Sequence, residues 1–131
     1  MTILYADDDP DDRELILEAF KKIDHSINCL TAPDGIEAID ILRRIVELPN
    51  YIFLDVNMPL MDGKDCLIEL KKDERLKVIP VIIYSTTADR DEIKNFYSLG
   101  ASSFLQKPNN FEELCSRLRM FIKVVQLDNV K

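Results

Sequence analysis

Short apolar runs alternate with longer amphipathic stretches along the whole chain. The apolar runs predict β-strands at 2–6, 27–31, 50–55, 80–85 and 102–106. Apolar residues spaced three or four positions apart predict helices at 10–24, 34–47, 63–72, 89–98 and 110–126. Strands that alternate with helices favour right-handed crossovers and a mainly parallel sheet with helices on both faces. The pattern therefore predicts an α/β fold.

Capping signals agree with these helix starts. Asp9 precedes Pro10, and proline suits the first position of a helix. Three more starts have a capping residue followed three positions later by a glutamate: Asp34 with Glu37, Asp89 with Glu92, and Asn110 with Glu113.

Length and composition limit the architecture. A chain of 131 residues that is 47% hydrophobic fits one domain over 1–131, and we expect no output domain after the last helix. The net charge of -7 argues against nucleic acid and anionic membranes as partners. No stretch is typical of a signal peptide or a membrane span, so we expect a cytoplasmic protein. Cys29, Cys66 and Cys115 are too widely spaced for a zinc motif, and we expect free thiols.

Polar side chains stand where four of the predicted strands end. Asp7 and Asp8 follow the first strand, Asp55 ends the third, Ser85 ends the fourth and Lys107 follows the fifth. In open α/β sheets the carboxyl ends of the strands form the ligand-binding edge, so these side chains are expected to converge. Each also has a simpler interpretation, as a turn residue, a helix-start acid or a surface charge. Their combination favours a shared site.

A cluster of three carboxylates favours a bound cation. If the first and third strands are neighbours, Asp7, Asp8 and Asp55 repel one another by roughly a few kcal/mol per close pair. Oxygen ligands select hard ions, and Mg²⁺ suits a site with few protein ligands and a phosphate to share. The backbone carbonyl of Asn57 is a candidate fourth oxygen. Beside such an ion the Asp55 carboxylate could attack phosphorus to form an acyl phosphate. Lys107 and Ser85 would then contact the phosphoryl oxygens.

These residues resemble the receiver domain of two-component response regulators over essentially the whole chain. The matching motifs are the Asp7-Asp8 pair, Asp55 with Met58-Pro59 and Gly63, Ser85, and Lys107-Pro108. The resemblance implies a flavodoxin-like (βα)5 sandwich with strand order 2-1-3-4-5. The run after Asp8 and the Ser85-Thr86 pair resemble the stand-alone regulators that accompany phytochrome-type kinases, although the family often has alanine or glycine where Thr86 stands.

The resemblance also implies a role for each site residue. Asp7, Asp8, Asp55 and the Asn57 carbonyl would hold Mg²⁺, and Asp55 would accept a phosphoryl group from a sensor histidine kinase or a histidine phosphotransfer protein. Lys107 would pair with the phosphate, and Ser85 would move toward it. Phe104 would occupy the aromatic switch position, although it is equally typical of a half-buried strand aromatic. The Lys107–Pro108 bond would be cis.

We expect the output to be a change in protein–protein contacts. The face made by the fourth helix, fifth strand and fifth helix would contact an unknown target or a second copy, so the chain would be a monomer or a homodimer. Candidate contacts are Tyr97, Phe104, Phe121, Val124 and Val125, of which the last three are more typical of core packing.

Two other functions stay open at this point. A phosphatase of the haloacid-dehalogenase type also uses an aspartyl nucleophile with Mg²⁺, but it needs an aspartate where this chain has Asn57. A flavodoxin-like binding module, or a receiver that is never phosphorylated, is the second alternative. A flavin site would need a loop rich in Gly, Ser or Thr after the first strand, and the loop here is acidic.

Overall fold

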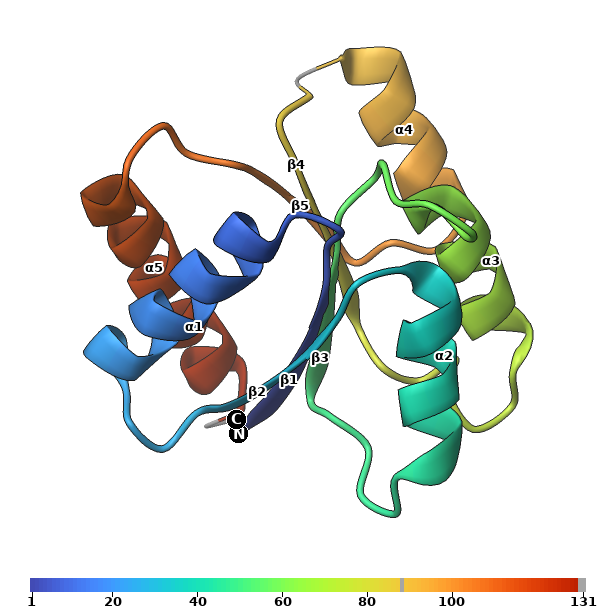
Figure 1. The fold of residues 1–131 in the computed structure, drawn as a ribbon, viewed down its shortest axis with the longest axis horizontal. Coiled ribbons are helices and arrows are strands. Elements are labelled where there is room, and N and C mark those ends of the chain that lie inside the picture. The colour runs from blue at the N-terminus through green and yellow to red at the C-terminus, as the bar shows by residue number, and fades with distance from the viewer. Residues whose placement is uncertain (88, 130–131) are drawn as a thin grey trace.

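A parallel five-stranded sheet in the order β2-β1-β3-β4-β5 forms the centre of the molecule. The structure, a computed structural model, describes residues 1–87 and 89–129 (Figure 1). The strands are β1 (Thr2–Ala6), β2 (Asn28–Ala32), β3 (Tyr51–Leu54), β4 (Val81–Ser85) and β5 (Ser103–Gln106). The helices are α1 (Pro10–Ile23), α2 (Gly35–Arg44), α3 (Gly63–Lys72), α4 (Arg90–Ser98) and α5 (Phe111–Asn129). The predicted fold class and strand order are therefore confirmed.

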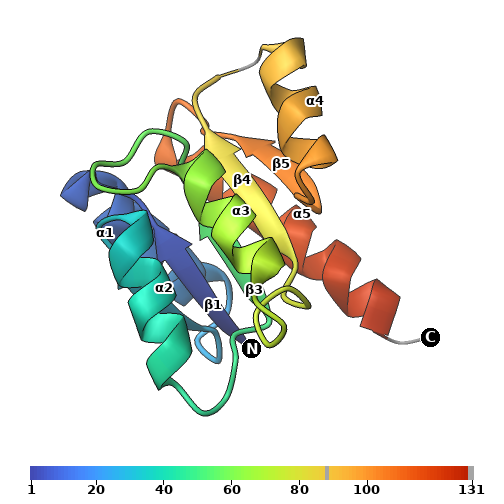
Figure 2. The same cartoon turned by 90° about the vertical axis from the view of Figure 1, so that its right-hand side faces the viewer.

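Helices cover both faces of the sheet and divide the core into two layers. α1 and α5 lie on one face, while α2, α3 and α4 lie on the other (Figures 1 and 2). Side chains of β1 alternate between the layers: Ile3 and Tyr5 pack toward α1 and α5, and Leu4 and Ala6 pack toward α2 and α3. Because both faces are covered, the central strands are apolar throughout, which explains the runs in the sequence.

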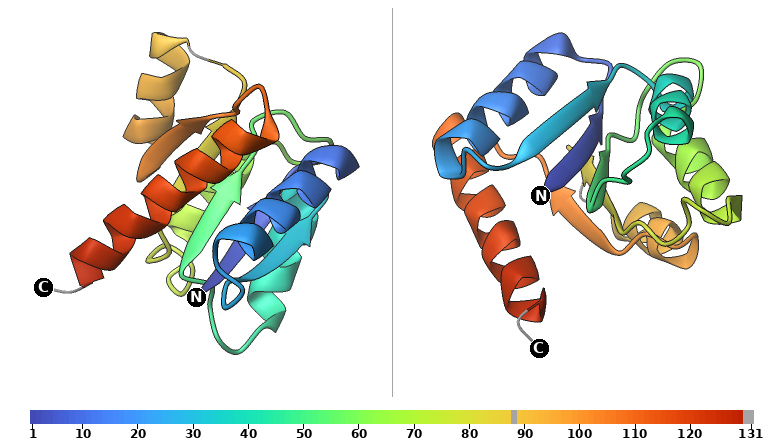
Figure 3. Two further views of the ribbon diagram at one scale, coloured as in Figure 1. Left: turned by 90° about the vertical axis from the view of Figure 1, so that its left-hand side faces the viewer. Right: turned by 90° about the horizontal axis from the view of Figure 1, so that it is seen from below.

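One side of the last helix, α5, packs into the core. Phe121 lies edge-on against Phe53 and Tyr51, with ring centroids 5.3 and 5.2 Å apart, and Val125 is buried. The expectation that Val125 supplies contact area is therefore wrong, whereas Phe121 is half-buried against the aromatic layer under α5 and its role as a contact stays a prediction. Val124 and Tyr97 are exposed, as that expectation requires. Figure 3 shows α5 crossing the sheet beside α1.

Capping side chains fix where the helices begin. Asp9 caps α1, and the Oδ1 atoms of Asp34 and Asn110 accept the expected N–H groups of Glu37 and Glu113, each at 2.8 Å. Asp89 caps α4 but accepts from Asp91 instead of Glu92. α3 has a cap that the sequence analysis missed, because Asp62 accepts from the N–H of Asp65.

Most element boundaries lie within one residue of their predicted positions, but α2 and α5 differ by three. α2 ends at Arg44 and not at residue 47, because Ile45 takes an extended conformation. Arg75, from the loop after α3, donates to the carbonyls of Leu42, Ile45 and Val46. This guanidinium satisfies carbonyl groups that a helix end leaves without partners. α5 continues to Asn129, past the expected end at 126.

The cysteines are free thiols, as predicted. Burial raises the pKa of the Cys29 and Cys66 thiols to about 12, which keeps both protonated at neutral pH. Within residues 1–87 and 89–129, the helices are all too short or too polar to cross a bilayer.

Replacing Arg75 with methionine should destabilise the protein by about 1–2 kcal/mol, because three carbonyl groups lose a charged donor while the aliphatic stem is retained. Urea unfolding followed by circular dichroism measures the change. Arg43→Met removes an exposed arginine from α2 itself and serves as the matched control. An equal effect of the two substitutions would show that the Arg75 contacts contribute nothing.

Candidate functional site

Four strand ends bring the predicted site residues to one edge of the sheet. Asp7 and Asp8 directly follow β1, Asp55 follows β3, Ser85 is the last residue of β4, and Lys107 follows β5. The ladder continues past the strands: the N–H of Asp55 donates to the Ala6 carbonyl at 2.9 Å, and that of Lys107 to the Ser85 carbonyl at 2.7 Å. These backbone hydrogen bonds fix the register of Asp55 and Lys107 relative to the neighbouring strands.

Three carboxylates gather at this edge. Asp7, Asp8 and Asp55 each offer an oxygen, and the three oxygens lie within 4.8 Å of one another. Asp7 has no solvent exposure and Asp55 is 8% exposed, whereas Asp8 is exposed. Charges of one sign at this spacing and burial repel strongly. The donor set, all oxygen and partly open to solvent, fits a hard divalent cation.

The Lys107 ammonium group lies among the carboxylates. Its Nζ is 2.7 Å from Asp7 Oδ2, 2.9 Å from Asp12 Oδ2 and 3.3 Å from Asp55 Oδ1. Burial alone lowers the pKa of Lys107, but hydrogen bonds to Asp7 and Asp12 and the charge of Asp55 outweigh it, so the pKa is above its ordinary value. Lys107 therefore stays protonated and offsets part of the negative charge.

Asp55 has an unusually high affinity for protons. Burial, together with the charge of Asp7, raises its pKa from 3.8 to about 6. Lys107 and the N–H of Val56 act in the opposite direction without cancelling the rise. Without a metal ion, Lys107 alone therefore does not fully stabilise the charged form of Asp55. A divalent ion or another positive group at the site would lower its pKa.

Asp7 is held in place by donors that the sequence analysis did not identify. The Tyr5 hydroxyl donates to Asp7 Oδ2, and the N–H of Asp9 donates to Asp7 Oδ1 at 3.0 Å. Arg13 donates to the Asp7 carbonyl at 2.7 Å. Tyr5 could have been noticed as a hydroxyl inside an otherwise apolar strand two residues before Asp7, because a buried tyrosine hydroxyl needs a partner.

The loop after β3 brings its backbone tightly against Asp55. A Cβ atom on Gly63 would lie 2.3 Å from the Asp55 carbonyl oxygen, so only glycine fits. The N–H of Gly63 bonds to the Val56 carbonyl at 2.9 Å, and Leu60 turns the chain with a φ of 66°. Asn57 lies in this loop with an exposed side chain, two residues beyond Asp55.

Ser85 and its neighbours approach the site from β4. Ser85 is 3% exposed, and its hydroxyl oxygen accepts from the N–H of Thr87 at 3.2 Å. The hydroxyl proton is therefore still available to an acceptor. Thr86 is exposed, and its carbonyl accepts from the Gln106 side chain at 3.4 Å.

Two further expectations concern β5 and the residues that directly follow it. The described residues contain no cis peptide bond, so the predicted cis Lys107–Pro108 bond is wrong. The cis bond was implied only by the family resemblance, whereas the trans isomer is generally favoured before proline by about 0.5–1 kcal/mol. Phe104 is half-buried against the α2–α3–α4 layer, which agrees with its interpretation as a strand aromatic and leaves a switching role untested.

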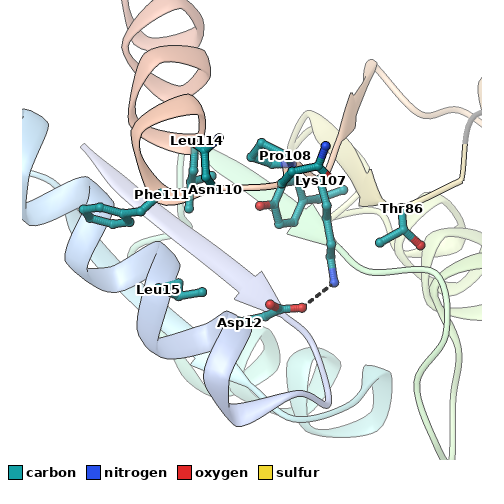
Figure 4. Close-up of a pocket in the computed structure, with 10 residues that line it drawn as sticks. Asp12, Leu15, Thr86, Lys107, Pro108, Asn110, Phe111 and Leu114 are labelled. Carbon is teal, nitrogen blue, oxygen red and sulfur yellow. Dashed lines mark hydrogen bonds and ion pairs between the residues drawn. The ribbon is translucent and has the colours of Figure 1, made fainter.

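A cavity of about 340 Å³ opens beside Lys107, between α1 and the start of α5 (Figure 4). Leu15, Phe111 and Leu114 supply apolar lining, while Asp12, Thr86 and Lys107 supply polar and charged lining. The Asp12–Lys107 ion pair, with an Nζ–Oδ2 distance of 2.9 Å, therefore forms part of the cavity lining.

Comparisons with known proteins agree with this geometry. Residues 3–119 match the family model of the response regulator receiver domain. The response regulator Rcp1 of Synechocystis sp. is 34% identical over 119 residues, which are 86% of this chain and 80% of Rcp1. The phosphorylated cyanobacterial phytochrome response regulator RcpA superposes with a TM-score of 0.84 at 32% identity, covering 92% of this chain and 89% of RcpA. The Mn²⁺-bound form of Rcp1 gives 0.77 at 30%, covering 90% and 88%.

The chain belongs to the receiver domain family of response regulators. It is thus a phosphoacceptor in two-component signalling, with a signalling and not a metabolic role. Receiver domains interact with histidine kinases or phosphotransfer proteins and bind a divalent metal at an acidic pocket, which corresponds here to the cluster of Asp7, Asp8 and Asp55.

The raised pKa of Asp55 predicts how stability depends on pH. A folded-state pKa above the unfolded value adds stability below about pH 4 that is lost as pH rises through about 6. At pH 7.5 without divalent ions, Asp55→Asn should therefore raise the free energy of unfolding by about 1–2 kcal/mol. The gain should vanish near pH 4, where Asp55 is protonated. Urea unfolding at the two pH values measures both changes.

Asp8→Asn is the matched control, because it removes an exposed charge from the same cluster. We expect a smaller gain from it at pH 7.5. If Asp55→Asn were instead destabilising at pH 7.5, the Asp55 charge would be favourable in the folded protein and the sign of the pKa shift would be wrong.

Proposed function

We propose that Asp55 is the phosphoacceptor of this receiver domain. The observation that carries the proposal is the position of its carboxylate, 8% exposed, between Asp7, Asp8 and Lys107 at the end of a central strand. The Lys107 ammonium group, together with a cation held by the carboxylates, could offset the charge of an incoming phosphoryl group. The exposed Asp8 marks the open side from which a donor can approach.

Asp7, Asp8 and Asp55, with the backbone carbonyl of Asn57, are the residues we assign to Mg²⁺. The cluster of oxygens within 4.8 Å supports this assignment. A cation there would counteract the burial and the Asp7 charge that together raise the pKa of Asp55. When bound, the ion would offset the negative charge of the phosphoryl oxygens during transfer. Mg²⁺ is preferred because it accepts a few carboxylates and keeps several waters.

In the proposed reaction, an Asp55 oxygen forms a bond to phosphorus while the bond between phosphorus and a histidine nitrogen of the kinase or phosphotransfer protein breaks. The electron pair of that bond stays on the nitrogen, so a histidine that is protonated at its other ring nitrogen leaves as neutral imidazole. Lys107 contributes its charge to the phosphoryl oxygens, and the Ser85 hydroxyl donates a hydrogen bond. Hydrolysis of the acyl phosphate later restores the carboxylate.

The signal would pass to a partner through changed contacts. We assign a switching role to the single domain over 1–131. In this switch, Ser85 moves toward the phosphoryl group, and the Phe104 side chain on β5 then changes its position. The α4–β5–α5 face, with Tyr97 and Val124 exposed, is the candidate contact surface for a target or for a second copy.

Incubation with Mg²⁺ and acetyl phosphate tests the assignment of Asp55. Intact mass should show a gain of one phosphoryl group in the wild type and in Asp65→Asn, an exposed aspartate on α3, but none in Asp55→Asn. Modification that persists in Asp55→Asn would place the acceptor elsewhere. Turnover of free phosphate esters at enzyme-like rates would instead favour a phosphatase of the haloacid-dehalogenase type.

Mg²⁺ should stabilise the folded protein through the assigned ligands. Binding to the folded state alone adds about 1.4 kcal/mol when the ion is at ten times its dissociation constant. The rise in melting temperature should be reversed by a chelator and lost in Asp8→Asn, whereas Asp65→Asn should keep it. An undiminished rise in Asp8→Asn would remove Asp8 from the ligand set.

A further inference from the structure

Lys107 has a third anionic partner whose role the proposed function does not explain. Asp12 lies in the first turn of α1, and its Oδ2 accepts from Lys107 Nζ at 2.9 Å (Figure 4). The ion pair connects α1 to the end of β5, two segments that are 95 positions apart in the sequence.

Three carboxylates surround the ammonium group of Lys107, and two of them, Asp7 and Asp12, accept hydrogen bonds from it. An ammonium has three N–H donors, and Asp7, Asp12 and Asp55 all lie within 3.3 Å of Nζ. A phosphoryl group on Asp55 would bring new anionic oxygens that need a donor from Lys107. These oxygens would compete with the existing carboxylate partners for the protons of the ammonium group.

Burial decides which partner is released. The Asp7 side chain has no exposure, so leaving it without a charged donor would be costly. The Asp12 side chain is 32% exposed, and water can solvate its carboxylate once Lys107 moves away. Asp55 itself carries the phosphoryl group and stays close to Nζ.

We propose that Asp12 is a positioning residue that holds Lys107 in the resting state and gives it up to a phosphoryl oxygen when Asp55 is modified. This inference rests on the proposed function of Asp55. The Asp12–Lys107 pair competes with the phosphoryl group, so it favours the unmodified protein.

Fluoroberyllate, a phosphoryl analogue that binds a carboxylate without a chemical step, tests the competition. In the presence of Mg²⁺, Asp12→Asn should bind it about three- to tenfold more tightly than the wild type, because a neutral amide retains Lys107 less strongly. The measurement is a titration followed by ¹⁹F NMR. Asp11→Asn removes the same charge from the neighbouring exposed position and should change the affinity less than about twofold.

The Lys107→Gln background separates positioning from simple charge repulsion. If Asp12 acts through Lys107, Asp12→Asn should no longer improve binding there, although overall binding is weaker. In the metal-free proteins, the shifts in urea midpoint caused by Asp12→Asn and Lys107→Gln should also be non-additive. This second measurement needs no ligand.

An equal gain in Asp11→Asn and Asp12→Asn, or a gain that persists in Lys107→Gln, would overturn the positioning role. Additive urea midpoints would overturn it as well. In each of these cases a wild type that binds fluoroberyllate leaves the role of Asp55 intact. A wild type that neither binds the analogue nor becomes phosphorylated would overturn both proposals.

Discussion

The site depends on one buried ammonium group that neutralises several carboxylates. Without Lys107, Asp7 would be an anion with no exposure and no opposite charge within hydrogen-bond reach among the described residues. The fold makes this arrangement possible because β1, β3, β4 and β5 are neighbours in one parallel sheet and end at the same edge. The arrangement still favours binding of a cation, because burial and the charge of Asp7 keep the pKa of Asp55 raised despite the nearby Lys107.

Much of the fold was predictable because strand and helix periods differ. The central strands β1, β3 and β4 are largely buried on both faces and appear as mainly apolar runs, while the helices carry an apolar stripe. The convergence of Asp7, Asp8, Asp55 and Lys107 followed from the rule that parallel strands present their carboxyl ends together. That rule needs only the order of elements and the residue after each strand.

What could not be predicted depends on side chains that meet across long stretches of sequence. Arg75 bonds to the end of α2 from a loop 29 or more positions away, and no local pattern announces that contact. Asp12 pairs with Lys107, which lies 95 positions further along the chain, and no local pattern connects the two. Phe121 and Val125 lie on an apolar stripe that is more typical of core packing but can also face a partner, and only the structure shows which contacts they make.

The aromatic rings beneath the site make it observable without a label. The chain has no tryptophan and four tyrosines, so its near-ultraviolet signal comes mainly from those rings. Tyr84 lies 5.5 Å from the Lys107 ammonium, and its ring is edge-on to that of Tyr5, whose hydroxyl contacts Asp7. Any rearrangement of Lys107 changes the electric field at these rings, so the protein carries its own spectroscopic reporter of the state of the carboxylate cluster.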